Sequence, residues 1–328
     1  MTSTAIAPTG SQTVSASLAA RYLTIMVMST LISGAVIAGY LQYLYLAGLL
    51  PPVPITGSIA LDEKMAFVRD SLHGDFDIIA AGSSMAMNNL SSDAFLQEAS
   101  QPKRVLNIGS WGLKISASRR WLNHVLKYVH VQKVILVTGP MDFSAQGLLL
   151  NNVSDSDLDT FLTKGPGYPL LLVQKFSLPY YARPMANHRQ RRDDYDSLQF
   201  DSGGAVPFEI YYPNVRLDRW NGRLDPGFFA LLIDNEYDHL ALMAKDLRSR
   251  GVDLVVIRAL MRSHVQSSGG AQLEEHWDRV KRIVTEGKQR YLDLSGELLL
   301  DDSYFADYAH LNAKGAFVFS RSIAQHLQ

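Results

Sequence analysis

A long apolar segment without a charged side chain, running from Tyr22 to about Leu50, constrains this chain of 328 residues more than any other feature. At about 1.5 Å per helical residue, roughly 24 residues span about 36 Å, more than a hydrocarbon core of about 30 Å. Three tyrosines gather toward one end, as tyrosines do at a membrane interface: Tyr40, Tyr43 and Tyr45. Pro51 and Pro52 then stop the helix. We therefore expect residues 21–50 to form one transmembrane anchor in a bilayer.

Two other interpretations of the apolar segment are a cleaved signal peptide and a buried helix of a soluble protein. The segment is longer than the apolar region of a typical signal peptide, begins well inside the chain and precedes no clear A-x-A site. A buried helix of this length is uncommon without a polar face. Arg21 precedes the segment and charges of both signs follow it, which favours a cytoplasmic N-terminus. We expect a single-pass protein of the cell membrane whose folded part is periplasmic or extracellular.

The rest of the chain divides by composition. Residues 1–20 are rich in Ser, Thr and Ala, carry no charge and show no periodicity, which predicts a disordered tail. Residues 51–74 are expected to form a linker and a first helix, and residues 75–328 one folded domain. Within that domain, residues 145–230 contain Pro, Gly and many aromatic residues, which predicts an irregular insertion over one rim of a sheet.

Short apolar runs alternate with amphipathic segments elsewhere in the folded part. The runs predict strands at residues 77–81, 104–108, 133–138, 252–257 and 291–294. The amphipathic segments predict helices at residues 115–128, 232–250 and 271–288. Continuous apolar strands alternating with helices are typical of a mainly parallel sheet covered on both faces. The fold class is therefore expected to be a three-layer α/β sandwich.

Charge and composition exclude several classes of function. The 31 Lys and Arg residues against 32 Asp and Glu give a net charge of −1, which argues against nucleic-acid binding driven by bulk positive charge. The absence of Cys excludes disulfides, thiolate zinc sites and cysteine nucleophiles. None of the nine His residues forms H-E-x-x-H, and Gly109-x-x-Gly112 is too short for a phosphate or dinucleotide loop. We expect neither a metal nor a cofactor.

Two motifs near opposite ends of the folded part contain the residue types of nucleophilic catalysis. Gly82-Ser83-Ser84 follows the first strand, where parallel sheets place ligand-binding turns. Asp307 lies three residues before His310, so a single turn brings its carboxylate onto the imidazole. A serine hydroxyl needs a base to take its proton, and the histidine needs a carboxylate to hold one tautomer. Taken singly, the first motif fits an ordinary helix N-cap and the second a surface loop, but together they supply all three roles.

The two motifs together resemble those of the SGNH/GDSL hydrolase superfamily. There the first block carries the nucleophilic serine, here Ser84, and the last block carries Asp and His three residues apart, here Asp307 and His310. The run from Asn107 to Gly112 is similar to the second block, which implies an oxyanion hole formed by the N–H groups of Ser84 and Gly112.

The third block departs from the family pattern. Gly139-Pro140-Met141-Asp142 stands where the family reads G-x-N-D, so Met141 replaces an asparagine that would be the third oxyanion donor. Losing one such donor costs roughly 10²–10³ in rate when nothing substitutes. Either a nearby residue such as Asn107 substitutes, or the enzyme is slow or specialised.

The GSS form of the first block, the HLN-x-x-G ending and the anchor look most like a membrane-anchored subset of the superfamily. That subset includes proteins of alginate O-acetylation and of teichoic acid D-alanylation. The resemblance implies an SGNH-like three-layer sandwich and a serine acyl-esterase or O-acyltransferase. It would act through an acyl-serine on acyl groups, of the acetyl type, of a cell-surface polysaccharide. A multi-pass membrane acyltransferase is the implied partner.

Two alternatives stay open. One is an inactive or weakly active scaffold that binds polysaccharide or the acyltransferase, in line with Met141 and with five aromatic residues of the insertion: Tyr180, Tyr181, Tyr211, Tyr212 and Trp220. The other is a lysophospholipase-like esterase, because an anchored site lies close to lipid.

Overall fold

The computed structural model describes residues 16–47, 52–98, 104–148, 150–164, 175, 177–181, 195–224 and 226–328. Three parts of the sequence predictions lie outside these ranges. They are the tail before Ala16, the end of the predicted anchor at residues 48–50 and part of the predicted irregular insertion, at residues 165–174 and 182–194.

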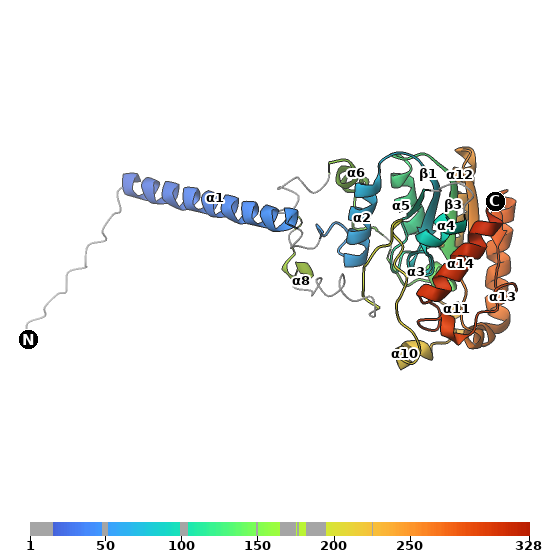
Figure 1. Ribbon diagram of the computed structural model, residues 1–328. Coiled ribbons are helices and arrows are strands. Elements are labelled where there is room, and N and C mark those ends of the chain that lie inside the picture. The colour runs from blue at the N-terminus through green and yellow to red at the C-terminus, as the bar shows by residue number, and fades with distance from the viewer. Residues whose placement is uncertain are drawn as a thin grey trace, which may run out of the picture.

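The apolar segment forms one long helix, α1 (Ala16–Leu46). It projects away from the folded part (Figure 1), and within the described residues it is the one helix long and apolar enough to cross a membrane. The hydroxyls of Thr24 and Thr30 donate to the carbonyls of Ala20 and Met26, so these polar groups are satisfied inside the helix. Residues 16–20, predicted as tail, are helical because their Ala and Leu content continues the helix.

Five parallel strands form the sheet, in the order β2-β1-β3-β4-β5. They are β1 (Phe76–Gly82), β2 (Val105–Asn107), β3 (Val131–Thr138), β4 (Asp253–Arg258) and β5 (Arg290–Leu292). In the register, Ile79 of β1 lies beside Leu106 of β2 and Val134 of β3. The inner strands are mostly apolar in their buried parts because helices cover both faces, and the buried polar exceptions are Thr138 at the end of β3 and Arg258 at the end of β4. The predicted parallel α/β fold is confirmed.

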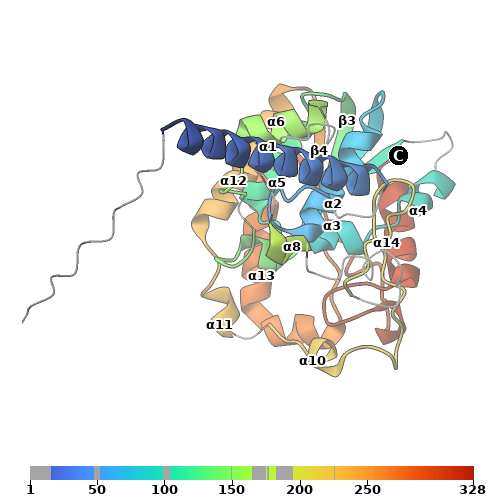
Figure 2. The same ribbon diagram turned by 90° about the vertical axis from the view of Figure 1, so that its left-hand side faces the viewer.

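Helices cover the sheet in two groups. The first consists of α5 (Ile115–Val125), α12 (Asp234–Ser249) and α13 (Ser263–Glu286), with α12 packed against both others. The second contains α4 (Ser92–Glu98) and the C-terminal α14 (Ala313–His326), which pack together. Figure 2 shows the two groups on either side of the strands, as right-handed crossovers in this strand order require.

One helix begins earlier than predicted. The sequence predicts a helix at residues 271–288, whereas α13 starts at Ser263 and is kinked at Gly270 (φ +51°). Polar residues and two glycines before position 271 hide the first turns from a periodicity analysis.

The region between β3 and β4 is irregular. It contains η1 (Pro140–Phe143), α6 (Asp155–Lys164), α8 (Leu178–Tyr181), α10 (Leu217–Trp220) and α11 (Pro226–Phe229). One stretch of it lies beside the edge strand β2, where Gly203 accepts the Asn107 N–H at 2.7 Å. Further along, the Phe208 carbonyl accepts the Ala313 N–H at 2.7 Å, which ties the stretch to the start of α14. The region therefore borders the C-terminal edge of the sheet.

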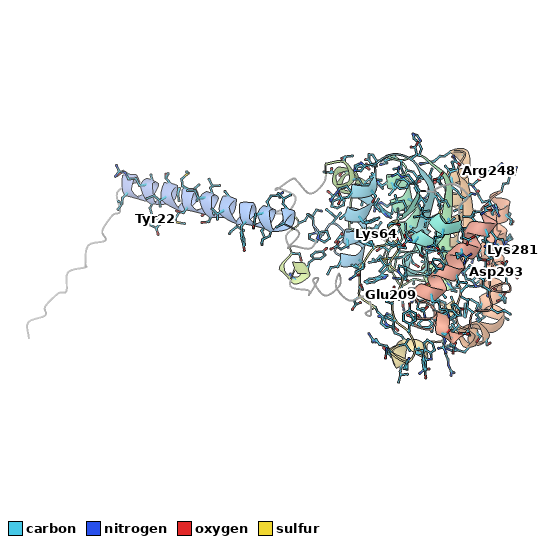
Figure 3. All side chains as sticks on the ribbon, viewed as in Figure 1. Tyr22, Lys64, Glu209, Arg248, Lys281 and Asp293 are labelled. Atoms are coloured by element: carbon cyan, nitrogen blue, oxygen red, sulfur yellow. The ribbon has the colours of Figure 1, made fainter. Side chains whose placement is uncertain are left out.

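A buried lysine joins this region to the rest of the fold. Lys64 of α2 (Ile59–Ser71) is fully buried (Figure 3), and its ammonium donates to the carbonyls of Asn107 and Gly204. Burial lowers the pKa of Lys64 to about 7, against the opposing negative charge of Asp201. The Phe200 ring lies 4.6 Å from the ammonium. These contacts link α2, β2 and the irregular region.

Candidate active site

Ser84 lies at the C-terminal edge of the sheet, in the turn from β1 to α3 (Ser84–Asn88). Gly82 ends β1 with φ +135°, and a Cβ there would lie 2.3 Å from the carbonyl oxygen of Val137, so the turn requires glycine. The Ser83 hydroxyl caps α3 by accepting the Met85 N–H at 3.2 Å. As the first residue of α3, Ser84 has an N–H without a partner inside the helix.

His310 lies in the loop between η3 (Asp302–Tyr304) and α14. Asp307 Oδ1 accepts the backbone N–H groups of Ala309 at 2.8 Å and His310 at 2.7 Å, which closes a tight turn. The same carboxylate contacts the imidazole, with His310 Nδ1 2.8 Å from Oδ2 and 3.0 Å from Oδ1. Asn312 ends the loop by capping α14 through the Gly315 N–H. The spacing of three residues thus forms the single turn that the sequence predicts.

Asn89 connects the serine's helix to the histidine's loop. It follows α3 directly and is fully buried. Its Oδ1 accepts the Leu311 N–H at 2.9 Å, and its Nδ2 donates to the Ala309 carbonyl at 3.4 Å. The sequence analysis did not identify Asn89, because these partners lie 222 and 220 positions further along the chain.

These supports bring Ser84 and His310 into contact. The Ser84 Oγ lies 2.8 Å from His310 Nε2. Burial of Asp307 raises its pKa, but the His310 charge and hydrogen bonds from the ring and from two backbone N–H groups outweigh burial and lower it below the ordinary value. An ionised carboxylate only accepts hydrogen bonds, so Nδ1 carries the donated proton and Nε2 accepts the Ser84 hydroxyl. The charge and tautomer suit proton removal from serine.

A cavity of about 310 Å³ opens beside this contact. Apolar side chains form much of its wall: Met85, Met141, Leu224 and Met261. The loop residues Tyr308, Ala309 and His310 close one side, and Gly112, Gln146 and Gly147 lie on another. A small, partly apolar space next to a serine hydroxyl fits a short acyl group better than a long chain.

Gly112 lies in the cavity wall with φ +71°, a conformation that favours glycine. Its carbonyl accepts the Leu148 N–H at 2.7 Å, which holds the Gly112 turn against the loop that carries Gln146. The structure thus brings Ser84 and Gly112, the two predicted backbone donors, to one cavity. Two N–H groups at one cavity are the minimum for an oxyanion hole.

Asn107 is not placed as the sequence suggests. Its side chain is buried, its Nδ2 donates to the Ala86 carbonyl at 2.7 Å, and its Oδ1 accepts the Gly109 N–H at 2.9 Å. It is not among the residues that line the cavity. The residue instead holds the Gly109 turn against α3, and this correction removes it as a substitute for the third oxyanion donor.

The sequence analysis assigns no role to two further residues of the cavity. Gln146 supplies the single side-chain amide among the described residues that line it, beside Met141 and Gly112. Asp142 accepts the Thr138 hydroxyl at 2.8 Å and the Gly139 N–H at 3.1 Å. Burial raises the pKa of Asp142 to about 6 despite these bonds. The third-block resemblance marked Asp142 without a role, whereas Gln146 carries no sequence signal.

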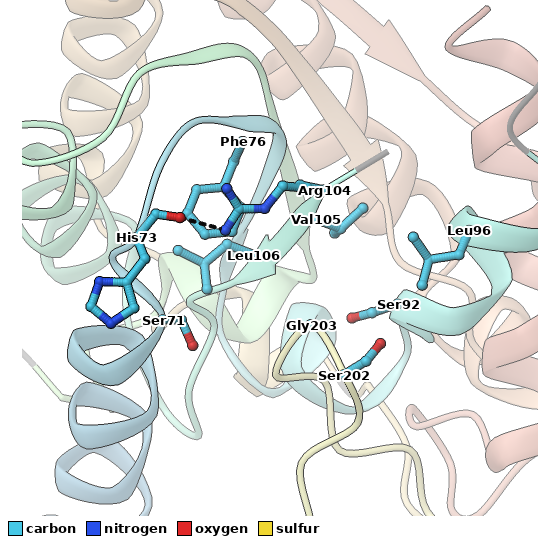
Figure 4. A pocket seen from close by; sticks show the side chains of 10 residues that line it. All are labelled: Ser71, His73, Phe76, Ser92, Leu96, Arg104, Val105, Leu106, Ser202 and Gly203. Carbon is cyan, nitrogen blue, oxygen red and sulfur yellow. Dashed lines mark hydrogen bonds between the residues drawn. The ribbon is translucent and has the colours of Figure 1, made fainter. Parts of the chain in front are cut away.

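Another cavity, about 380 Å³, lies beside the edge strand β2, whose Val105 and Leu106 line it (Figure 4). Its one cationic group in the described residues, Arg104, is occupied within the fold. The guanidinium donates to the carbonyls of His73 and Asp75 and lies 4.5 Å from the Phe76 ring. We therefore assign Arg104 a structural role. No cluster of three or more His, Asp or Glu side chains suited to a metal ion occurs within the described part of the chain.

No protein-family model matches the chain, and a search of curated proteins finds no match. Solved structures of similar fold include a lipase/acylhydrolase from Enterococcus faecalis, with 12% identity, a TM-score of 0.41, and 77% of this chain and 95% of that chain covered. A carbohydrate acetylesterase from Sinorhizobium meliloti has 11% identity and a TM-score of 0.40, over 77% of this chain and 98% of that chain. A GDSL-like lipase from Bacteroides thetaiotaomicron has 9% identity and a TM-score of 0.40, over 81% and 96%. At these values the likenesses assign no activity to this chain.

Proposed function

We propose that this chain is a membrane-anchored serine acyl-esterase or O-acyltransferase that works through an acyl-serine intermediate. The observation that carries the proposal is the continuous chain of contacts from Ser84 Oγ to His310 Nε2 at 2.8 Å and from His310 Nδ1 to Asp307 at 2.8 Å. Serine alone is a weak nucleophile, and this arrangement supplies the base and the group that orients it.

The first half-reaction forms the acyl-serine. His310 Nε2 takes the Ser84 proton as Oγ attacks the ester carbonyl carbon, and the carbonyl oxygen becomes an oxyanion facing the N–H groups of Ser84 and Gly112. When the intermediate collapses, the carbon–oxygen bond to the leaving group breaks, and His310 returns the proton to the departing oxygen.

The second half-reaction removes the acyl group from Ser84. His310 takes a proton from water, or from a sugar hydroxyl, as its oxygen attacks the acyl-serine. Collapse of the second intermediate returns the proton to Ser84 and releases a carboxylic acid in the first case or a new ester in the second. Esterase and transferase therefore share one site and differ in the acceptor.

The proposed substrate is a cell-surface polysaccharide that carries short acyl groups, acetyl first among them. The cavity of about 310 Å³ supports a short acyl group, and its apolar wall suits a methyl. The polysaccharide, the exported location of the folded part and a multi-pass membrane acyltransferase partner are proposed from the family resemblance and from α1, whose length and apolar surface fit a bilayer.

The competing proposal is a scaffold without turnover. Met141 at the cavity favours it, because it removes a donor that the resemblance leads one to expect. The ordered contact between Ser84 and His310 favours the enzyme, because a scaffold has no need of it.

Hydrolysis of p-nitrophenyl acetate by the full chain in lipid nanodiscs tests the proposal. We expect Ser84→Ala and His310→Ala each to lower kcat/KM by about 10³-fold or more. Ser249→Ala and His130→Ala are matched controls, since both residues are exposed and neither lines the cavity. Unchanged activity in both site variants, or no hydrolysis by the folded wild type, would reject the enzyme.

A further inference from the structure

A further cavity, about 510 Å³, is lined in part by residues from both ends of the loop that carries His310. It is lined by Tyr211, Tyr212 and Trp220 from the irregular region and by Asp302, Ser303 and Lys314 from around that loop. The cavity thus combines aromatic faces with a hydroxyl, a carboxylate and an ammonium.

The aromatic side of this cavity is rigidly supported. The Trp220 ring lies against the Arg262 guanidinium at 3.5 Å, and Arg262 also donates to the Trp220 carbonyl at 2.7 Å and to Asp302 at 2.8 Å. Tyr212 lies on Trp220 with ring centroids 5.6 Å apart and remains 63% exposed. A largely exposed ring on a fixed base is a stacking surface rather than part of the core.

The loop that carries His310 borders both cavities, although no described residue lines both. Tyr308, which lines the catalytic cavity, accepts the Arg262 N–H through its carbonyl at 3.3 Å and donates its own N–H to the Arg219 carbonyl at 3.2 Å. The turn after Trp220 packs directly on the Tyr308 ring, because a Cβ on Gly222 would lie 2.3 Å from it. Asp302 and Ser303 face one cavity, and Tyr308 and His310 face the other. A ligand that occupied both cavities would have to pass around this loop.

We propose that this second cavity, which we call the Tyr212 subsite, binds a sugar unit of the glycan whose acyl group occupies the catalytic cavity. The occupant rests on the proposed function. Sugar rings present C–H faces that pack on aromatic rings, and their hydroxyls pair with side chains that donate and accept, as Ser303, Asp302 and Lys314 do. Because Arg262 forms an ion pair with Asp302, the carboxylate of Asp302 does not repel a neutral or a mildly acidic sugar from the subsite.

Calorimetric binding to the full chain carrying Ser84→Ala, in lipid nanodiscs, tests the subsite without turnover. The probes are O-acetylated hexasaccharides with gluco-, manno- and xylo-backbones and with a mannuronic acid backbone. We expect at least one to bind, Tyr212→Ala to weaken it by about 3- to 10-fold and Tyr212→Phe to retain most of the affinity, because the ring makes the contact. Tyr128→Ala is the matched control, an exposed tyrosine elsewhere on the molecule.

Three results overturn the subsite. The first is that no probe binds, and the second is that Tyr212→Ala and Tyr128→Ala weaken binding equally. The third is that the chain binds a lysophospholipid instead of a glycan and that Tyr212→Ala abolishes this binding, which assigns the cavity to lipid. Because the assay needs no turnover, failure here is distinct from failure of wild-type esterase activity.

Discussion

The catalytic cavity and the Tyr212 subsite share a loop but are built in different ways. The first takes the serine and part of its wall from the turns that follow β1 and β3, and the rest from the His310 loop and from other loops around it. The second takes its aromatic side from the irregular region and its polar side from the ends of η3 and α14. The sheet and the loops at its edge therefore position the groups proposed for catalysis, whereas the irregular region positions the aromatic rings proposed to bind sugar.

Asp307→Asn tests the catalytic cavity, and we expect it to have the largest effect on activity. An asparagine amide no longer holds the His310 tautomer that leaves Nε2 free to accept, so we expect kcat for p-nitrophenyl acetate to fall by about 10³- to 10⁴-fold. Asp253→Asn, at the exposed start of β4, is the control. A fall of less than tenfold would mean that Asp307 only shapes the loop.

Met141→Asn tests whether the cavity lacks an oxyanion donor. If the side chain at position 141 faces the oxyanion, an added amide donor raises kcat by about tenfold, since one such donor contributes about 10²-fold or more in a complete site. Met141→Leu keeps the wall apolar and is expected to give no gain. Equal rates for both variants would show that another group, such as Gln146, already fills this role.

His276→Phe probes the buried interior beside η1, whose Met141 and Asp142 line the catalytic cavity. His276 bonds the Tyr237 hydroxyl through Nδ1 at 2.7 Å and contacts the Phe143 ring of η1. Burial, with the nearby charges of Arg258 and Arg279, lowers the pKa of His276 from 6.5 to about 3. Between these two pH values the imidazole of His276 is protonated in the unfolded chain but not in the folded chain. The contribution of neutral His276 to the free energy of unfolding is therefore present above about pH 6.5 and is lost as the pH falls toward about 3.

Urea unfolding followed by tryptophan fluorescence measures this effect. Between about pH 6 and pH 4, the free energy of unfolding of the wild type should fall relative to His276→Phe by about 1.4 kcal/mol per pH unit. Parallel pH curves for the two proteins would show that His276 is not buried in the neutral form.

Arg104→Ala tests the cavity beside β2 that Figure 4 shows, and it has the smallest expected effect. Because the guanidinium is bound to carbonyls of the neighbouring turn, its loss should slightly lower stability and change esterase kcat/KM by less than about twofold. A large loss of activity in a variant that still folds would place the functional site at the cavity in Figure 4 instead.

Much of the fold was predictable because its signals are local. The strands that became β1, β3 and β4 are apolar runs, and the motif around Asp307 and His310 closes on itself within one turn. The start of α13 was not predictable, because its polar first turns before Gly270 lack a clear apolar period. The sequence analysis identifies the tyrosines of the subsite among the aromatic residues of the insertion, but nothing in their spacing shows that Tyr212 stacks on Trp220.

Two buried amides show which roles the sequence does not reveal, because Asn89 was missed and Asn107 was expected to be a substitute oxyanion donor. Asn89 and Asn107 are both buried amides, and the chain alone does not show that one supports the His310 loop while the other supports the Gly109 turn. Gln146 reaches the cavity because its loop pairs with Gly112, a contact between segments separated in sequence.

Labelling of the full chain by a fluorophosphonate tests the central claim most directly, because the probe phosphonylates only an activated serine. The account predicts one adduct per chain by intact mass, located by peptide mapping at Ser84, absent in Ser84→Ala and formed far more slowly in His310→Ala. An unlabelled but folded wild type, or an adduct on a serine outside the cavity, would contradict it.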